Sequence, residues 1–136
     1  MADPRHPRGL IDTSVVIDLE LIEPADLPLE LAVSAITMAE LAAGPHATAD
    51  PAERARRQDR LQRAEATFEP LPIDAAVARA YGRVYAAVCA AGRKARGRRA
   101  ADLFIAATAL AAGLPLYTRN PDDFAGLSKM LEIVAV

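Results

Sequence analysis

Cysteine, tryptophan and long apolar runs are what this sequence has least of. The single cysteine, Cys89, excludes an internal disulfide and any zinc site built from several cysteines, and it suits a reducing compartment. The two histidines, His6 and His46, are far apart in the chain and form no metal-binding pair. Aromatic residues make up 4% of the chain, too few for a surface that stacks RNA bases, so alanine, leucine and valine must fill the core.

The chain also lacks an apolar run that could cross a membrane. The longest nearly apolar stretch, 103–116, has 14 residues and includes Gly113 and Pro115, whereas a membrane span needs about 20. The N-terminal stretch MADPRHPRG is polar and contains no apolar signal-peptide core. We therefore expect a soluble, cytoplasmic protein with no membrane partner.

Neither sign of charge dominates, because the formal net charge is −2. A length of 136 residues, with 52% hydrophobic and 25% charged residues, predicts one globular domain over 1–136. Positive charge is concentrated in one basic segment, 93–99, which contains Arg93, Lys94, Arg96, Arg98 and Arg99. The glycines around the basic segment are spaced as in a phosphate-binding loop. However, Arg98 and Arg99 stand where such a loop has lysine and a hydroxyl, and a helix precedes it, which excludes a nucleotide triphosphatase.

Apolar runs and helix caps alternate along the chain in the order typical of an α/β protein. Short buried strands are predicted at 10–11, 31–36, 71–73 and 114–117, with an edge strand at 131–136. Helices are predicted after the caps Thr13 or Ser14, Thr37, Asp50 and Asp74, and over 100–112, where Gly113 ends the helix. This alternation predicts a three-layer α/β/α sandwich around a central, mainly parallel sheet.

Four acidic residues stand where a predicted strand meets a loop or where a predicted helix begins: Asp12, Glu40, Asp102 and Asp123. Right-handed crossovers bring such junctions to one edge of a parallel sheet. Each acid also has a purely structural interpretation, as a cap, a turn residue or a partner of the helix dipole. Asp102 fits that interpretation worst, because it is expected in the first turn of an apolar helix, where an unanswered carboxylate is costly.

Clustered carboxylates need a cation. Two of them about 4 Å apart repel by on the order of 4 kcal/mol at an effective dielectric of 20. The stretches around the four acids, 10–14, 34–41, 99–109 and 117–124, contain no histidine or lysine to offset this repulsion. Mg²⁺, with Mn²⁺ as a substitute, takes oxygen ligands from a few carboxylates and keeps waters for a substrate phosphate. The sequence therefore predicts metal-assisted phosphodiester hydrolysis without a protein nucleophile.

Four motifs around these acids make the chain similar to a known family. They are LIDTS at 10–14, SAITMAEL at 34–41, RAADLFIAATA at 99–109 and YTRNPDDF at 117–124. The chain resembles the PIN-domain nucleases over essentially its whole length, and among them the VapC-type toxins of bacterial toxin–antitoxin pairs.

The resemblance implies that Asp12, Glu40 and Asp102 are magnesium ligands, directly or through water. It favours Asp123 as the fourth acid, with Asn120 as the second choice and Asp122 as a solvated residue. Ser14 and Thr118 match hydroxyl positions that help to hold the cluster, together with Asn120. The resemblance also implies endonucleolytic cleavage of tRNA or ribosomal RNA, a homodimer, and a cognate antitoxin that fills the active-site groove in a hetero-oligomer.

The basic segment directly precedes the helix that carries Asp102, so it is predicted to contact RNA phosphates, which position a substrate without specifying it. Alternatively, Arg98 or Arg99 pairs with a neighbouring acid. Two other functions stay open. A catalytically silent binding module on the same scaffold is disfavoured by the four filled acidic positions. A phosphatase with an aspartyl nucleophile is disfavoured because Ser14 stands where its second aspartate is expected.

Overall fold

The computed structural model describes residues 5–93 and 98–136, with Arg98 placed by its backbone alone. At the centre of this described part is a sheet whose strands are β1 (Arg8–Ile11), β2 (Glu30–Ala32), β3 (Leu116–Thr118) and β4 (Ile133–Ala135). The strand order is β2-β1-β3-β4 and every pairing is parallel. The predicted edge strand near the C-terminus is therefore confirmed as β4.

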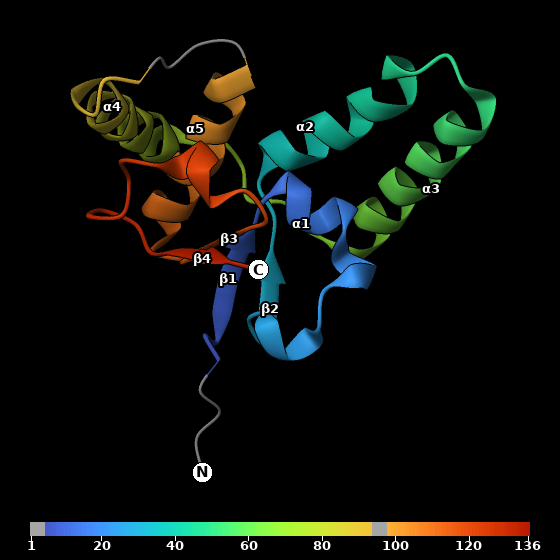
Figure 1. The fold of residues 1–136 in the computed structure, drawn as a ribbon, viewed down its shortest axis with the longest axis horizontal. Helices are drawn as coiled ribbons and strands as arrows, with labels where there is room; N and C mark the ends of the chain where they lie inside the picture. Colours follow the sequence, from blue (N-terminus) through green and yellow to red (C-terminus); the bar gives the residue numbers. More distant parts are fainter. Residues whose placement is uncertain (1–4, 94–97) are drawn as a thin grey trace.

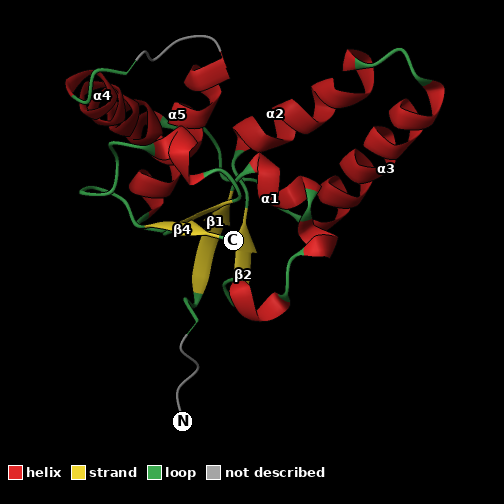
Figure 2. Ribbon diagram, in the orientation of Figure 1, coloured by secondary structure: helices red, strands yellow, loops and turns green. Residues whose placement is uncertain are grey.

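Helices cover both faces of the sheet (Figures 1 and 2). They are α1 (Thr13–Ile17), α2 (Ala35–Ala43), α3 (Pro51–Thr67), α4 (Ala75–Ala90) and α5 (Arg98–Ala112). Short 3-10 turns complete the described part: η1 (Leu19–Leu21), η2 (Pro24–Asp26), η3 (Gly44–Ala47) and η4 (Pro121–Phe124). In Figure 1, α4 and α5 lie to the left of the strands and α2 and α3 to the right. None of the described helices is long and apolar enough to cross a bilayer.

Successive strand residues point to opposite faces and build two cores. Leu10, Ala32 and Leu116 pack with α4 and α5, through residues such as Val84 and Leu103. The next residue of each segment, Ile11, Val33 or Tyr117, packs with α1, α2 and α3 on the other face. Since a strand alternates its side chains with period two, the two separate cores confirm the predicted three-layer α/β/α sandwich.

The predicted strand at 31–36 is too long, because α2 begins inside it. Ser34 is the N-cap of α2, and its Oγ accepts the N–H of Thr37 at 3.1 Å. The prediction that Thr37 is the cap is therefore wrong, and Glu40 lies in the second turn of α2 rather than the first. Serine and threonine both cap helices, so the sequence alone did not separate two hydroxyl residues three positions apart.

Three further predicted boundaries differ from the structure. Residues 71–73 form no strand, and Leu71 makes only an isolated bridge to Ser34. The first helix is capped by Asp12 rather than by Thr13 or Ser14, because Oδ1 of Asp12 accepts the N–H of Val15 at 3.2 Å. Helix α5 already includes Arg98, so Asp102 is one turn inside it and not in its first turn.

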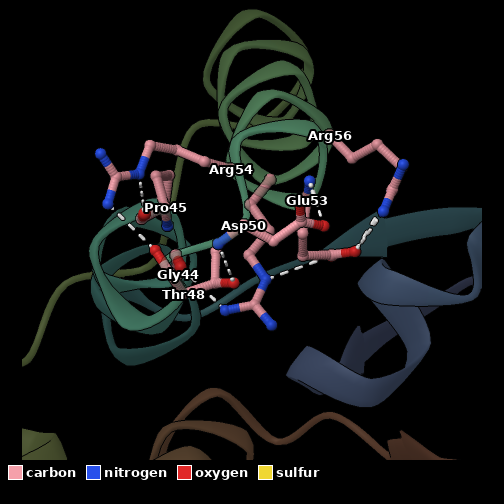
Figure 3. Close-up of polar contacts among 8 residues, drawn as sticks. Gly44, Pro45, Thr48, Asp50, Glu53, Arg54 and Arg56 are labelled. Carbon is pink, nitrogen blue, oxygen red and sulfur yellow. Dashed lines mark hydrogen bonds and ion pairs between the residues drawn. The ribbon is translucent and has the colours of Figure 1, made fainter.

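The start of α3 is fastened to η3 by arginine side chains (Figure 3). Nε of Arg54 donates to the Pro45 carbonyl at 3.0 Å, and Nη1 of Arg57 donates to the Gly44 carbonyl at 2.9 Å. Glu53 accepts from Arg56 and Arg57, and these hydrogen bonds lower the pKa of the Glu53 carboxyl. Arginines of α3 thus bind its first turns to η3, the 3-10 turn that follows α2.

Gly9 in β1 is needed because the ring of Tyr117 lies against it. A Cβ at position 9 would stand 2.6 Å from Cε1 of Tyr117 and 3.0 Å from Cγ of Pro28. Tyr117 is 3% exposed, and burial, followed by the nearby Glu132 carboxylate, raises the pKa of its phenol. Gly9 therefore lets the ring of Tyr117 pack closely on β1 just before the two strands reach Asp12 and Thr118.

We therefore expect Gly9→Ala to lower the free energy of unfolding by about 1–3 kcal/mol, the usual cost of overpacking a core, as measured by urea denaturation. Gly82→Ala is the matched control. It lies in α4 with nothing within 4 Å of its added Cβ, so it should raise stability by about 0.5–1 kcal/mol. Equal effects of the two substitutions would contradict the proposed contact.

Candidate active site

Asp12 lies at the carboxyl end of β1, where open α/β sheets place their ligand sites. It is 6% exposed, and its N–H donates to the Tyr117 carbonyl at 3.1 Å. Its Oδ1 accepts from the hydroxyl of Ser14 at 2.5 Å and from the N–H of Val15. Within the described part of the chain, no hydrogen bond reaches Oδ2, so one carboxylate oxygen is fixed and the other is available.

Ser14 connects Asp12 to the loop that follows β3. While its hydroxyl donates to Asp12, its Oγ accepts the N–H of Arg119 at 3.2 Å. Thr118 is buried, and its Oγ1 accepts the N–H of Asn120 at 3.0 Å. The two hydroxyls of the predicted site therefore shape the chain around Asp12 and at the end of β3.

Glu40 is connected to the same junction through Thr13. Its Oε1 accepts from the hydroxyl of Thr13 at 2.6 Å, and its side chain comes from α2, which packs against α1. Glu40 also borders a hollow of about 280 Å³ together with Thr13, Ile17 and Arg60. A hollow of this size has room for several waters.

Asp102 and Asp123 come from elements that pack beside these two acids. Asp102 is half-buried on α5, which packs against both α2 and η4. Asp123 is half-buried in η4, whereas Asp122 and Asn120 are exposed. The exposure pattern agrees with Asp123, rather than Asp122, as the acid that faces the protein.

The structure does not assemble all four acids around one point. Among residues 5–93 and 98–136, no three His, Cys, Asp or Glu side chains are grouped so that they could hold a metal ion. Asp12 and Glu40 are held by adjacent hydroxyls, whereas Asp102 lies on α5, which packs against α2, and Asp123 lies on η4, which packs against α5. The predicted four-acid metal cluster thus stays a prediction.

The carboxylate oxygens of Asp12 and Glu40 are nevertheless the type of ligand that Mg²⁺ prefers. Mg²⁺ is usually bound through one or two carboxylates, keeps several waters and takes further oxygens from substrate phosphates. Asp12 and Glu40 each have one oxygen fixed by a hydroxyl and a second oxygen with no bond from the described residues. Two carboxylates oriented in this way match the number of carboxylate ligands that a protein usually supplies to Mg²⁺.

The basic segment is only partly within the described residues. Lys94 and Arg96 lie outside them, and Arg98 is described only by its place in α5. Arg93 follows α4, and its N–H donates to the Val88 carbonyl at 3.1 Å. Nη1 of Arg99 donates to the backbone carbonyl of Asp123 at 3.0 Å, so the partner found among the described residues is a carbonyl rather than an acidic side chain.

The sequence did not reveal the contacts of two residues that hold the site. Thr13 was expected to cap a helix but bonds to Glu40. Arg99 was expected to contact RNA or to pair with an acid; it bonds to the backbone of the turn that carries Asp123, and its RNA contact stays a prediction. A hydroxyl beside an acid suits a cap as well as a ligand holder. The only available signal was that two adjacent hydroxyls, Thr13 and Ser14, exceed what one helix N-terminus needs.

We expect Arg99→Ala to loosen η4, with a loss of about 1 kcal/mol in unfolding free energy from the missing charged hydrogen bond. Faster hydrogen exchange at the amides of Asp123 and Ala125, which are bonded within this turn, measures the local effect. Arg79→Ala, at an exposed position of α4, is the control and should leave both amides protected. Unchanged exchange in Arg99→Ala would show that the contact does not order η4.

Comparison with known proteins identifies the family to which this chain is similar. The family model described as the PIN domain matches residues 10–129. Ribonuclease VapC5 of Mycobacterium tuberculosis is 37% identical over 133 residues, which cover 94% of this chain and 95% of the relative. Ribonuclease VapC4 of the same organism is 34% identical over 132 residues, covering 95% and 97%.

Solved structures agree with the sequence relatives. A toxin–antitoxin structure, VapBC-5 from Mycobacterium tuberculosis, matches with a TM-score of 0.80 and 36% identity, covering 96% of this chain and 99% of that chain. A toxin–antitoxin complex from Klebsiella pneumoniae matches with a TM-score of 0.63 and 28% identity, covering 93% and 96%. The similarity therefore extends over nearly the whole chain in both sequence and fold.

Proposed function

The chain belongs to the PIN-domain family, and on that premise we propose that it is a Mg²⁺-dependent endoribonuclease toxin, neutralised by a cognate antitoxin. The observation that carries the proposal is the pair of carboxylates at the sheet edge, Asp12 and Glu40, each with one oxygen fixed by a hydroxyl. The relatives that cover more than nine-tenths of the chain are named ribonucleases, which supports RNA as the substrate.

In this proposal some residues would bind the metal ion and others would hold the backbone around the site. Asp12, Glu40, Asp102 and Asp123 would hold the ion, directly or through water, while Ser14 and Thr118 keep the surrounding backbone in place. When bound, Mg²⁺ (or Mn²⁺) lowers the pKa of a coordinated water and stabilises charge on the leaving oxygen. Arg99 keeps the turn with Asp123 against α5.

The proposed partners are inferred in part from the solved structures that are similar to this chain. The similar VapBC-5 structure is named as a toxin–antitoxin system, which supports an antitoxin and a hetero-oligomer for this chain. A homodimer is proposed through α4, where Tyr85 is 45% exposed and the half-buried Tyr81 is stacked on Phe104 of α5. The substrate is proposed to be structured RNA of the tRNA or ribosomal class.

One observation favours a second candidate, a catalytically silent binding module on the PIN scaffold. No three potential metal-binding side chains converge in the part of the chain that the structure describes. A silent module would bind RNA or antitoxin without cleaving the RNA. The two candidates differ in whether purified protein cuts RNA when the metal is supplied.

Asp12→Asn tests the proposed activity most directly. Asparagine keeps the acceptor that caps α1 but removes the charge that Mg²⁺ needs, so we expect the fold to persist and cleavage to fall by about 100-fold or more. The measurement is cleavage of total RNA with Mg²⁺, with Mn²⁺ and with chelator, followed by mapping of the cut ends. Asp26→Asn, an exposed acid of η2, is the control; wild-type cleavage in chelator, or unchanged cleavage by Asp12→Asn, would contradict a metal role.

We further propose that the basic segment binds RNA phosphates, through Arg93, Lys94, Arg96 and Arg98. Replacing Arg93, Lys94 and Arg96 by glutamine should weaken binding and reduce the slope of log K against log salt by about 0.7 for each phosphate that is no longer neutralised. Binding is measured by fluorescence anisotropy with an uncleaved RNA on the Asp12→Asn background. Arg79→Gln with Arg83→Gln, both exposed on α4, is the control pair, and an unchanged slope in the triple variant would locate the RNA elsewhere.

A further inference from the structure

A chain of three hydroxyls leads from the protein interior to Glu40. Oγ1 of Thr13 lies 2.6 Å from Oε1 of Glu40 and 3.1 Å from Oγ1 of Thr37. Oγ1 of Thr37 lies 3.3 Å from Oγ of Ser34, which also accepts the N–H of Thr37. Thr37 and Ser34 are both 0% exposed, so bulk water does not replace these contacts.

Counting hydrogens gives the hydroxyl chain a single direction. A hydroxyl has one hydrogen, and an ionised carboxylate only accepts. The short contact to Glu40 therefore uses the hydrogen of Thr13, and Thr13 must in turn accept from Thr37. Thr37 then accepts from Ser34, because its own hydrogen is already used. The hydroxyls all point toward Glu40, and such aligned hydrogen bonds strengthen one another.

We propose that Thr13 is a positioning residue for the metal-binding carboxylate of Glu40, an inference that rests on the proposed function. The hydroxyl chain fixes Oε1, and Oε2 is the oxygen that would bind the ion. Ser14 does the same for Asp12 by fixing Oδ1. Two adjacent residues thus orient two acids that are far apart in the sequence, so both carboxylates share one rigid frame.

A purely structural role for Thr13 makes a different prediction. In that case its hydroxyl serves only as a partner for the buried Thr37, and its removal would lower stability without changing how Glu40 binds a metal. In the positioning role the hydroxyl matters for the metal, because partners that orient a ligand typically change metal affinity 10–100-fold. Metal affinity measured apart from catalysis separates the two roles.

The experiment compares Thr13→Val, Thr13→Ala and Thr13→Ser with the wild type. Mn²⁺ binding is followed by electron paramagnetic resonance of the protein without RNA, and melting is recorded without metal. We expect Thr13→Val and Thr13→Ala to bind Mn²⁺ 10–100-fold more weakly, and Thr13→Ser, which keeps the hydroxyl, to bind like the wild type. Two variants without the hydroxyl guard against misfolding of one of them. Thr67→Val, at an exposed position of α3, is the control.

The outcomes separate this inference from the proposed function. If Asp12→Asn abolishes cleavage but Thr13→Val and Thr13→Ala bind Mn²⁺ like the wild type, the positioning role is wrong and the nuclease stands. If Thr13→Ser is as weak as Thr13→Val, the hydroxyl is not the cause and the inference is likewise overturned. If the wild type binds no Mn²⁺ and cuts no RNA, both the proposed function and this inference fall.

Discussion

Three consecutive side chains that follow β1 begin α1 and connect it to α2 and to the loop after β3. Asp12 caps α1, Thr13 bonds to Glu40 on α2, and Ser14 bonds to the N–H of Arg119 after β3. The bonds of Thr13 and Ser14 leave α1 for two different segments, so the tripeptide is held both by α2 and by the loop after β3. The sheet supplies the support beneath it, because the N–H of Asp12 donates to the Tyr117 carbonyl of the neighbouring strand β3.

Most of the fold could be predicted from the sequence, because apolar periodicity marks what a strand or helix buries. The α/β alternation, the edge strand and the end of α5 at Gly113 all follow from it. Apart from the strand predicted at 71–73, which forms only an isolated bridge, the errors concern helix starts, where several residue types satisfy the same free N–H groups. Ser34 and Thr37 illustrate this ambiguity, since either hydroxyl is chemically a good cap and only the tertiary position of β2 decides between them.

Less of the site could be predicted, because residue types do not reveal which atoms meet. The four acids were identified as candidates from their junction positions. Their partners were not, since Thr13 was expected to be a cap and Arg99 to contact RNA or to pair with an acid. In the structure, Thr13 bonds to Glu40 and Arg99 bonds to the turn that carries Asp123. Long-range contacts of this kind depend on how α2, α5 and η4 pack, which no local pattern encodes.

The structural and functional interpretations of Asp12 are compatible, because a carboxylate has two oxygens. Oδ1 has the structural role, because it accepts hydrogen bonds from the hydroxyl of Ser14 and from the N–H of Val15 in the first turn of α1. The same bonds restrict rotation of the side chain, so a metal ion that binds Oδ2 as proposed would need less ordering of this residue. A helix cap is therefore a good starting point for a metal ligand. The same reasoning applies to Glu40, whose Oε1 is held by Thr13.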